Sequence, residues 1–307
     1  MDNVRLGKSD LVSSVIGLGG GSSGRFGLRQ GGTRSDALRL IRLGLDLGIT
    51  FFDGAGICGG VDELLRDGLA GRRNHVLLST KIHLGPDPLV GSTARLPNGL
   101  SSWTARRFGL VGSVATVRDR VERTLKALAT DHVDMLHLHA VSVGQLSPAM
   151  ERAVPLLLRM KEEGKLRAIG VTEQFLRDPG HAMLRGAVGT AGLDTIMAGV
   201  NFRNPDAAGN LLPAAKAADL GIIGMFTVRG MRGFEADDTL REIAAAAGAT
   251  GLPDLAYRWA RHHPLIDVVL TGTGNPDHLR DNVRAALAPP LAPAVLKRLE
   301  QWARRQR

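Results

Sequence analysis

The stretch VDMLHLHAVSVGQLSPAMERAVPLLLRMKEEGKLRAIGVT, residues 133–172, contains one complete strand–helix–strand unit. Val133–His139 and Ala168–Thr172 are short, largely apolar runs, as buried parallel strands are. Between them, Met150–Glu163 has the pattern of an amphipathic helix. A strand, a helix and a second strand in this order predict a parallel sheet covered by helices.

The same alternation continues on both sides of this unit. Further strands are expected over Val15–Leu18, Thr50–Asp53, Val76–Lys81, Thr195–Asn201, Gly221–Phe226 and Val268–Gly272. Further helices are expected over Ser35–Leu47, Ser113–Ala129, Ala207–Asp219, Thr239–Ala247 and Pro276–Leu287, with Ser35, Ser113 and Asn275-Pro276 at helix starts. Eight strands alternating with helices predict a (β/α)8 TIM barrel over residues 1–307 as one domain. A doubly wound sheet is the alternative, but the glycines at 17–21 are not followed by a helix at the distance that a dinucleotide-binding turn requires.

Composition excludes several classes of protein. The single cysteine, Cys58, cannot form an internal disulfide, which favours a reducing, cytoplasmic location. We expect no membrane span, because no apolar run reaches 18 residues, and no signal peptide, because MDNVRLGKSD (1–10) has no apolar segment. The net charge of +9 is spread over helical segments, and aromatic residues make up only 4% of the chain. We therefore expect solvated helix faces and no nucleic-acid partner.

One connection, His83 to Gly112, is about 30 residues long and contains Trp103 and Phe108. A loop of this length in a compact domain is usually a lid or a disordered segment, and the aromatic residues favour a lid.

Polar residues stand where the predicted strands end. Asp53, Lys81 and His139 end three successive strands, at the barrel face where catalytic residues gather. A buried charge needs a partner, so we expect Asp53 and Lys81 to pair beside His139. A structural ion pair is the alternative, and His137 is expected to be a buried structural residue. No metal site is expected, because neither His137/His139 nor His262/His263 has further ligands at suitable spacing.

Six segments in order resemble the aldo-keto reductases. They are RLGKSDLVSSVIGLGGG (5–21), FFDGAGICGGVDELL (51–65), VLLSTK (76–81), DHVDMLHLH (131–139), GKLRAIGVTEQF (164–175) and TGTGNPDHLRDN (271–282). The resemblance implies the same barrel with a short N-terminal β-hairpin, and hydride transfer between NADP(H) and a carbonyl or alcohol. It assigns catalytic roles to Asp53, Lys81 and His139.

The resemblance fails at the proton donor. The family places a tyrosine where this chain has Cys58, and the only tyrosine here, Tyr257, lies far along the chain. Cys58 is interpreted as a packing residue, a direct proton donor or a reactive thiol. His139 itself, or a water in the space of the phenol, is another possible donor.

The resemblance also implies binding residues. For the nicotinamide these are Thr172, Glu173, Asn201 and Met225, although Glu173 replaces an amide of the family and Met197 another. For the phosphates and adenosine they are Arg229, Gly272, Thr273, Gly274, His278 and Asn282, which weakly favour NADPH over NADH. Arg25, Phe26, Trp103 and Phe108 are expected around the substrate, with ordinary loop packing as the alternative.

The sequence thus predicts an NADP(H)-dependent oxidoreductase for a small carbonyl or alcohol, acting as a monomer or weak homo-oligomer. Two alternatives remain open: a redox-neutral lyase, dehydratase or isomerase on the same scaffold, and a non-catalytic protein that binds NADP(H) or a metabolite.

Overall fold

Eight parallel strands form a closed barrel in the computed structural model, which describes residues 1–21, 24–56, 59–85, 111–204, 207–229, 233–234 and 236–306. The strands are β3 (Ile16–Gly19), β4 (Phe51–Asp53), β5 (Leu77–Ile82), β6 (Val133–Val141), β7 (Leu166–Glu173), β8 (Thr195–Gly199), β9 (Gly221–Met225) and β10 (Val268–Thr271). The pairing of β10 with β3 closes the ring. All eight predicted strands are confirmed within two or three residues, and the doubly wound alternative is excluded.

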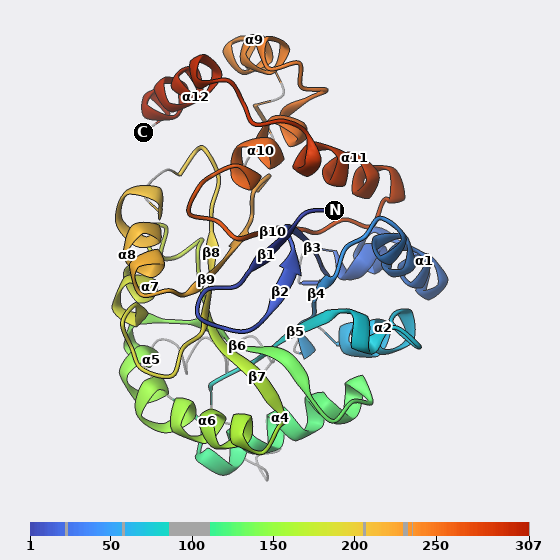
Figure 1. The fold of residues 1–307 in the computed structure, drawn as a ribbon, viewed down its shortest axis with the longest axis vertical. Helices are drawn as coiled ribbons and strands as arrows, with labels where there is room; N and C mark the ends of the chain where they lie inside the picture. Colours follow the sequence, from blue (N-terminus) through green and yellow to red (C-terminus); the bar gives the residue numbers. More distant parts are fainter. Residues whose placement is uncertain are drawn as a thin grey trace, which may run out of the picture.

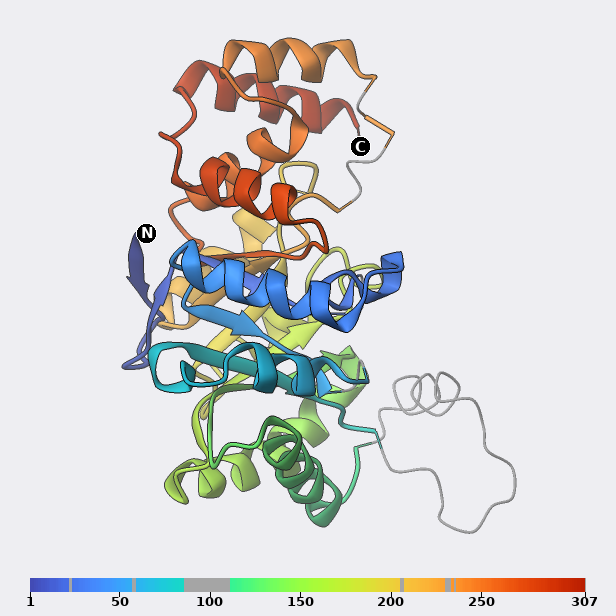
Figure 2. The same ribbon diagram turned by 90° about the vertical axis from the view of Figure 1, so that its right-hand side faces the viewer.

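Helices surround the strands (Figure 1). They are α1 (Arg34–Asp46), α2 (Val61–Gly68), α4 (Val114–Leu128), α5 (Val143–Pro148), α6 (Val154–Glu162), α7 (Ala182–Ala187), α8 (Leu212–Ala217), α9 (Asp238–Ala246), α10 (Leu252–Arg261), α11 (Pro276–Leu287) and α12 (Pro293–Arg305). Shorter turns are η1 (Arg25–Gln30), η3 (Arg73–His75), η4 (Ala149–Ala153) and η5 (Ala207–Leu211). Figure 2 shows α9 to α12 gathered at the opposite end of the molecule from α4. No helix of these described ranges is long and apolar enough to cross a membrane.

Two predicted helices begin with a π-helical turn. The segment expected to be a helix from Met150 opens with η4 before α6, and the segment from Ala207 opens with η5 before α8. A π-helical turn is wider than an α-helical turn, so it changes where the first residues of each helix lie. The apolar pattern of the sequence does not distinguish the two kinds of turn.

The start of α1 differs from the prediction. Thr33, not Ser35, is the N-cap: its hydroxyl accepts a hydrogen bond from Asp36 N–H, and the Asp36 carboxylate accepts one from Thr33 N–H. Ser35 has Leu38 three residues later and cannot form this reciprocal pair.

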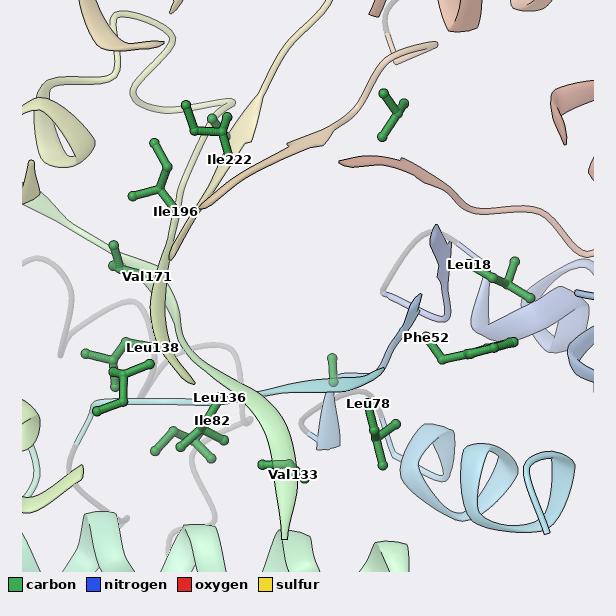
Figure 3. Close-up of a cluster of buried hydrophobic side chains, with 14 of the residues drawn as sticks. Leu18, Phe52, Leu78, Ile82, Val133, Leu136, Leu138, Val171, Ile196 and Ile222 are labelled. Carbon is green, nitrogen blue, oxygen red and sulfur yellow. The ribbon is translucent and has the colours of Figure 1, made fainter. Parts of the chain in front are cut away.

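Two apolar layers hold the barrel. The larger lies between strands and helices, where outward side chains such as Phe52, Leu78 and Ile196 are buried (Figure 3). The smaller fills the barrel interior and includes Leu6 and Leu11. These two come from the N-terminal hairpin of β1 (Asn3–Arg5) and β2 (Val12–Ser14), as the resemblance implied. The apolar plug fills one end of the barrel, which leaves the carboxyl ends of the strands for polar side chains.

Candidate active site

A buried ion pair lies at the carboxyl ends of β4 and β5. Lys81 Nζ donates to both carboxylate oxygens of Asp53, and to the carbonyl oxygen of Gly54 at 2.9 Å. Ser79 Oγ donates to Asp53 Oδ1 at 2.9 Å. The two charged side chains are only 7% and 5% exposed. The structure therefore brings Asp53 and Lys81 together as the strand ends predicted.

His137 lies below this pair, inside the barrel. Its Nδ1 is 3.3 Å from Ser79 Oγ and its Nε2 is 3.2 Å from Thr195 Oγ1. Burial, together with the charge of Lys81, lowers the pKa of His137 well below its ordinary value. Gly170 makes room for the ring, because a Cβ there would lie 2.4 Å from His137 Cδ2. A neutral imidazole between two hydroxyls is the structural role expected from the sequence.

His139 lies nearer the mouth and is only half-buried. Its ring packs edge-on against the ring of His83, with centroids 5.3 Å apart. We did not single out His83 from the sequence. The available signal was its spacing, because residues two apart on an extended segment share a face and His83 follows Lys81 by two.

A further carboxyl group is buried behind the β4–α2 loop. Asp62 is 2% exposed, and Thr80 Oγ1 donates to its Oδ1 at 3.3 Å. Burial, only partly offset by Thr80, raises the pKa of Asp62 to about 7. Asp62 lines a cavity of about 340 Å³ together with Lys81, His83 and residues of α4.

The predicted nicotinamide residues lie on neighbouring strand ends. Thr172 Oγ1 accepts a hydrogen bond from Ala140 N–H at 2.8 Å, and Asn201 Oδ1 accepts from the N–H groups of Arg203 and Asn204. Met225 is half-buried. Beside it, Phe226 stacks on Phe175 at 5.9 Å, and the Arg229 guanidinium lies 4.6 Å from the Phe226 ring centre.

Glu173 is engaged within the protein. His181 Nδ1 lies 2.8 Å from Oε2, and Gly199 N–H donates to Oε1 at 2.7 Å. Burial raises the pKa of the Glu173 carboxyl, and the contact with His181 opposes part of that rise. Both carboxylate oxygens have protein partners, so contact of Glu173 with a nicotinamide stays a prediction.

The turn Gly272–Gly274 precedes α11 and lies against η1. A Cβ on Gly274 would lie 2.2 Å from Gly27 Cα. The Asn275 side chain accepts hydrogen bonds from Asp277 N–H at 2.8 Å and His278 N–H at 3.4 Å, which confirms it as the helix cap. His278 is exposed, and Asn282 Nδ2 donates to Thr271 Oγ1 at 2.9 Å.

The model of the Aldo/keto reductase family matches residues 15–304. The chain is an aldo-keto reductase.

Relatives agree with this family. The chain is 27% identical over 301 residues to L-galactose dehydrogenase of Arabidopsis thaliana, which covers 91% of this chain and 86% of the plant protein. It is 24% identical to the aldo-keto reductase YhdN of Bacillus subtilis, over 91% of this chain and 87% of that protein. An aldo-keto reductase of Bacillus halodurans, solved in its holo form, superposes with a TM-score of 0.75 at 20% identity, over 98% of this chain and 96% of the other. The family is one of nicotinamide-dependent oxidoreductases, and this activity class is implied here.

The sequence predicts a proton donor other than a tyrosine, and this stays a prediction. Cys58, at the position of the family's tyrosine, lies outside the described residues. Tyr257 is on α10, and its hydroxyl donates to Thr271 Oγ1 at 3.0 Å behind β10. Complete burial raises the pKa of Tyr257 to about 12. A phenol held there is separated from Lys81 by the barrel wall, as the sequence suggested.

The predicted substrate residues divide into three groups. Phe26 is 1% exposed and packs beside Gly20, so its contact with a substrate stays a prediction. Arg25 is half-buried, with Nη2 3.7 Å from the position of a Cβ on Gly59. Trp103 and Phe108 lie outside the described residues, as does most of the loop interpreted as a lid.

The turn before α11 is packed closely against η1, because a Cβ on Gly274 would lie 2.2 Å from Gly27 Cα. A helix start is suited to bind phosphate, so the binding of a dinucleotide phosphate at α11 stays a prediction. His278 and Arg280 are exposed on α11, and Arg229 is exposed after β9. Among the described residues, no three His, Cys, Asp or Glu side chains gather in a way that could hold a metal ion.

Proposed function

We propose that this chain is an NADPH-dependent oxidoreductase that interconverts a small carbonyl compound and its alcohol, working as one barrel domain. The observation that carries the proposal is the buried Asp53–Lys81 pair at the strand ends, with half-buried His139 on the neighbouring strand β6. A charged pair at this depth costs free energy of folding, and its place at the carboxyl ends of barrel strands is where catalysis occurs.

The bound nicotinamide would supply the hydride. Thr172, Asn201 and Met225 would hold the nicotinamide ring, and Gly272–Gly274, His278 and Asn282 the adenosine phosphates. Lys81, fixed by Asp53, would place a positive charge where negative charge develops on the substrate oxygen. His139 would donate a hydrogen bond to the same oxygen and orient it.

The names of two relatives point to a class of substrate. One is named L-galactose dehydrogenase, and another, 26% identical over 68% of this chain, is named D-threo-aldose 1-dehydrogenase. Aldoses therefore belong in the first substrate panel, beside simple aldehydes.

The deciding experiment is binding of NADPH and NADH to the purified protein, by nicotinamide fluorescence and calorimetry. We expect a micromolar Kd for NADPH with a change in fluorescence, and weaker binding of NADH. The double variant Asp53→Asn/Lys81→Met should keep NADPH binding but lose at least about 100-fold in kcat, since both charges are removed together and none is left buried alone. No binding of either nucleotide at millimolar concentration would contradict the proposal and favour the redox-neutral alternative.

A further inference from the structure

His83 occupies a place at the site that the sequence did not assign. It follows Lys81 by two residues, on the extended segment that continues β5. Lys81 is paired in register with His137, so His83 is level with His139 on the neighbouring strand. The centroids of the His83 and His139 rings are 5.3 Å apart, with an angle of 71° between the ring planes. Lysine and two imidazoles therefore lie together at one end of the barrel.

His83 also borders open space. The cavity of about 340 Å³ is lined by His83 and Lys81, by Gly56 and Asp62 on one side, and by Arg120 on the other. Arg120 Nη1 donates to the carbonyl oxygen of His83 at 2.6 Å, which fixes the backbone at this point. His83 thus has the His139 ring as a neighbour and contributes to the lining of a cavity that also reaches Lys81.

We infer that His83 is the general acid that protonates the substrate carbonyl oxygen, in place of the tyrosine that this chain lacks. The inference rests on the proposed function. It divides the work between two imidazoles: His139 orients the oxygen and His83 delivers the proton. An imidazolium is suited to this task, because its ordinary pKa is close to neutral pH.

The step balances as follows. The carbonyl carbon receives a hydride, with its two electrons, from the reduced nicotinamide. The N–H bond of the His83 imidazolium breaks, and its proton forms the O–H bond of the product alcohol. The nicotinamide is oxidised, the carbonyl is reduced, and neutral His83 regains a proton from water in the adjoining cavity.

Charged side chains line the same cavity as His83. Lys81 on β5 and Arg120 and Arg123 on α4 are cationic, and Asp62 on α2 is the acidic group among the cavity residues.

The test compares His83→Ala with wild type and with His132→Ala, a control at a partly exposed histidine far from the site. Reduction of 4-nitrobenzaldehyde and glyceraldehyde by NADPH is followed from pH 5 to pH 9. We expect kcat to fall about 100- to 10,000-fold in His83→Ala, and the decline of kcat at alkaline pH to disappear. The Kd for NADPH should stay within about twofold, and His132→Ala should match wild type.

Chemical rescue and NMR give further readouts. Added imidazole should raise the kcat of His83→Ala at least about tenfold, because the cavity can admit an imidazole molecule. His139→Asn should lower kcat but keep the alkaline decline, and it should shift the NMR titration of the His83 ring protons. His83→Gln, which keeps a polar side chain of similar size, guards against a folding defect.

The outcomes separate the two proposals. NADPH binding with a normal rate and pH profile in both His83 variants overturns the role of His83 alone. The same holds if Cys58→Ser, rather than His83→Ala, removes the alkaline decline. NADPH binding with no reduction of either aldehyde by wild type overturns the proposed reduction together with this inference. Absence of NADPH binding by wild type overturns the oxidoreductase function together with this inference.

Discussion

The Asp62 carboxyl lies under the loop after β4 and carries little of its usual solvation. In the folded protein the pKa of Asp62 is about 7, whereas the ordinary value is 3.8. Between these two pH values the folded protein keeps a proton on Asp62 that the unfolded chain releases. Stability from this group is therefore greatest in acid and falls as pH rises through the interval between the two pKa values.

Asp62→Asn should remove this dependence. Between about pH 4 and pH 7 the free energy of unfolding of wild type should decline relative to the variant, with a total difference of at most about 4 kcal/mol. Urea unfolding at pH 5, 6, 7 and 8 measures the slope. Asp46→Asn, which removes an exposed carboxylate that is not among the groups shifting the pKa of Asp62, is the control and should follow wild type. Equal slopes in Asp62→Asn and wild type would refute the burial argument.

Single residues were predictable where their position on a strand fixed their neighbours. Asp53 and Lys81 lie near the ends of adjacent parallel strands, so their pairing followed from topology alone. The contact of Glu173 with His181 did not follow, because His181 lies in an irregular segment with a positive φ of 58° before α7. No periodic pattern describes such a segment. His83 lies one residue beyond β5 and escaped attention because the strand was expected to end at Lys81.

At the scale of an element, the N-cap of α1 distinguishes Thr33, which caps the helix, from Ser35, which does not. Thr33→Ala removes the hydroxyl that binds Asp36 N–H and should lower the free energy of unfolding by about 0.5–2 kcal/mol. Ser35→Ala removes only the exposed contact of Ser35 Oγ with Arg39. It should change the free energy of unfolding by less than about 0.5 kcal/mol. Chemical denaturation of both variants measures this, and a larger effect at Ser35 would contradict the observed cap.

The strands were predicted better than the helices. Each strand is a short apolar run buried on both faces, and that pattern ends at a polar residue or a glycine. The helices α5, α7, α10 and α12 were not predicted. α5 and α7 have six residues each, too few for a clear repeat. α10 and α12 pack against α9 in a separate apolar cluster, so the barrel argument did not require them.

At the scale of the whole molecule, the segments after the first and last barrel strands meet. Gly274→Ala would place a Cβ 2.2 Å from Gly27 Cα, so η1 and the turn before α11 must separate. We expect at least a tenfold rise in the Kd for NADPH, because this contact fixes the turn at the proposed phosphate site. Gly180→Ala, with no atom within 4 Å of the new Cβ, is the matched control. Calorimetry measures both, and unchanged affinity in Gly274→Ala would argue against a phosphate site at this turn.

The pairing of β3 with β10 also governs how the protein is made. Translation produces β3 near the start of the chain and β10 only near the end, so the nascent chain carries an incomplete, curved sheet for most of its synthesis. Throughout that time β3 has an unpaired edge of the kind that recruits other strands. Ring closure can follow only when residues 268–271 emerge from the ribosome. A slow-translating stretch before that point would lengthen the exposure, and chaperone dependence during expression should track it.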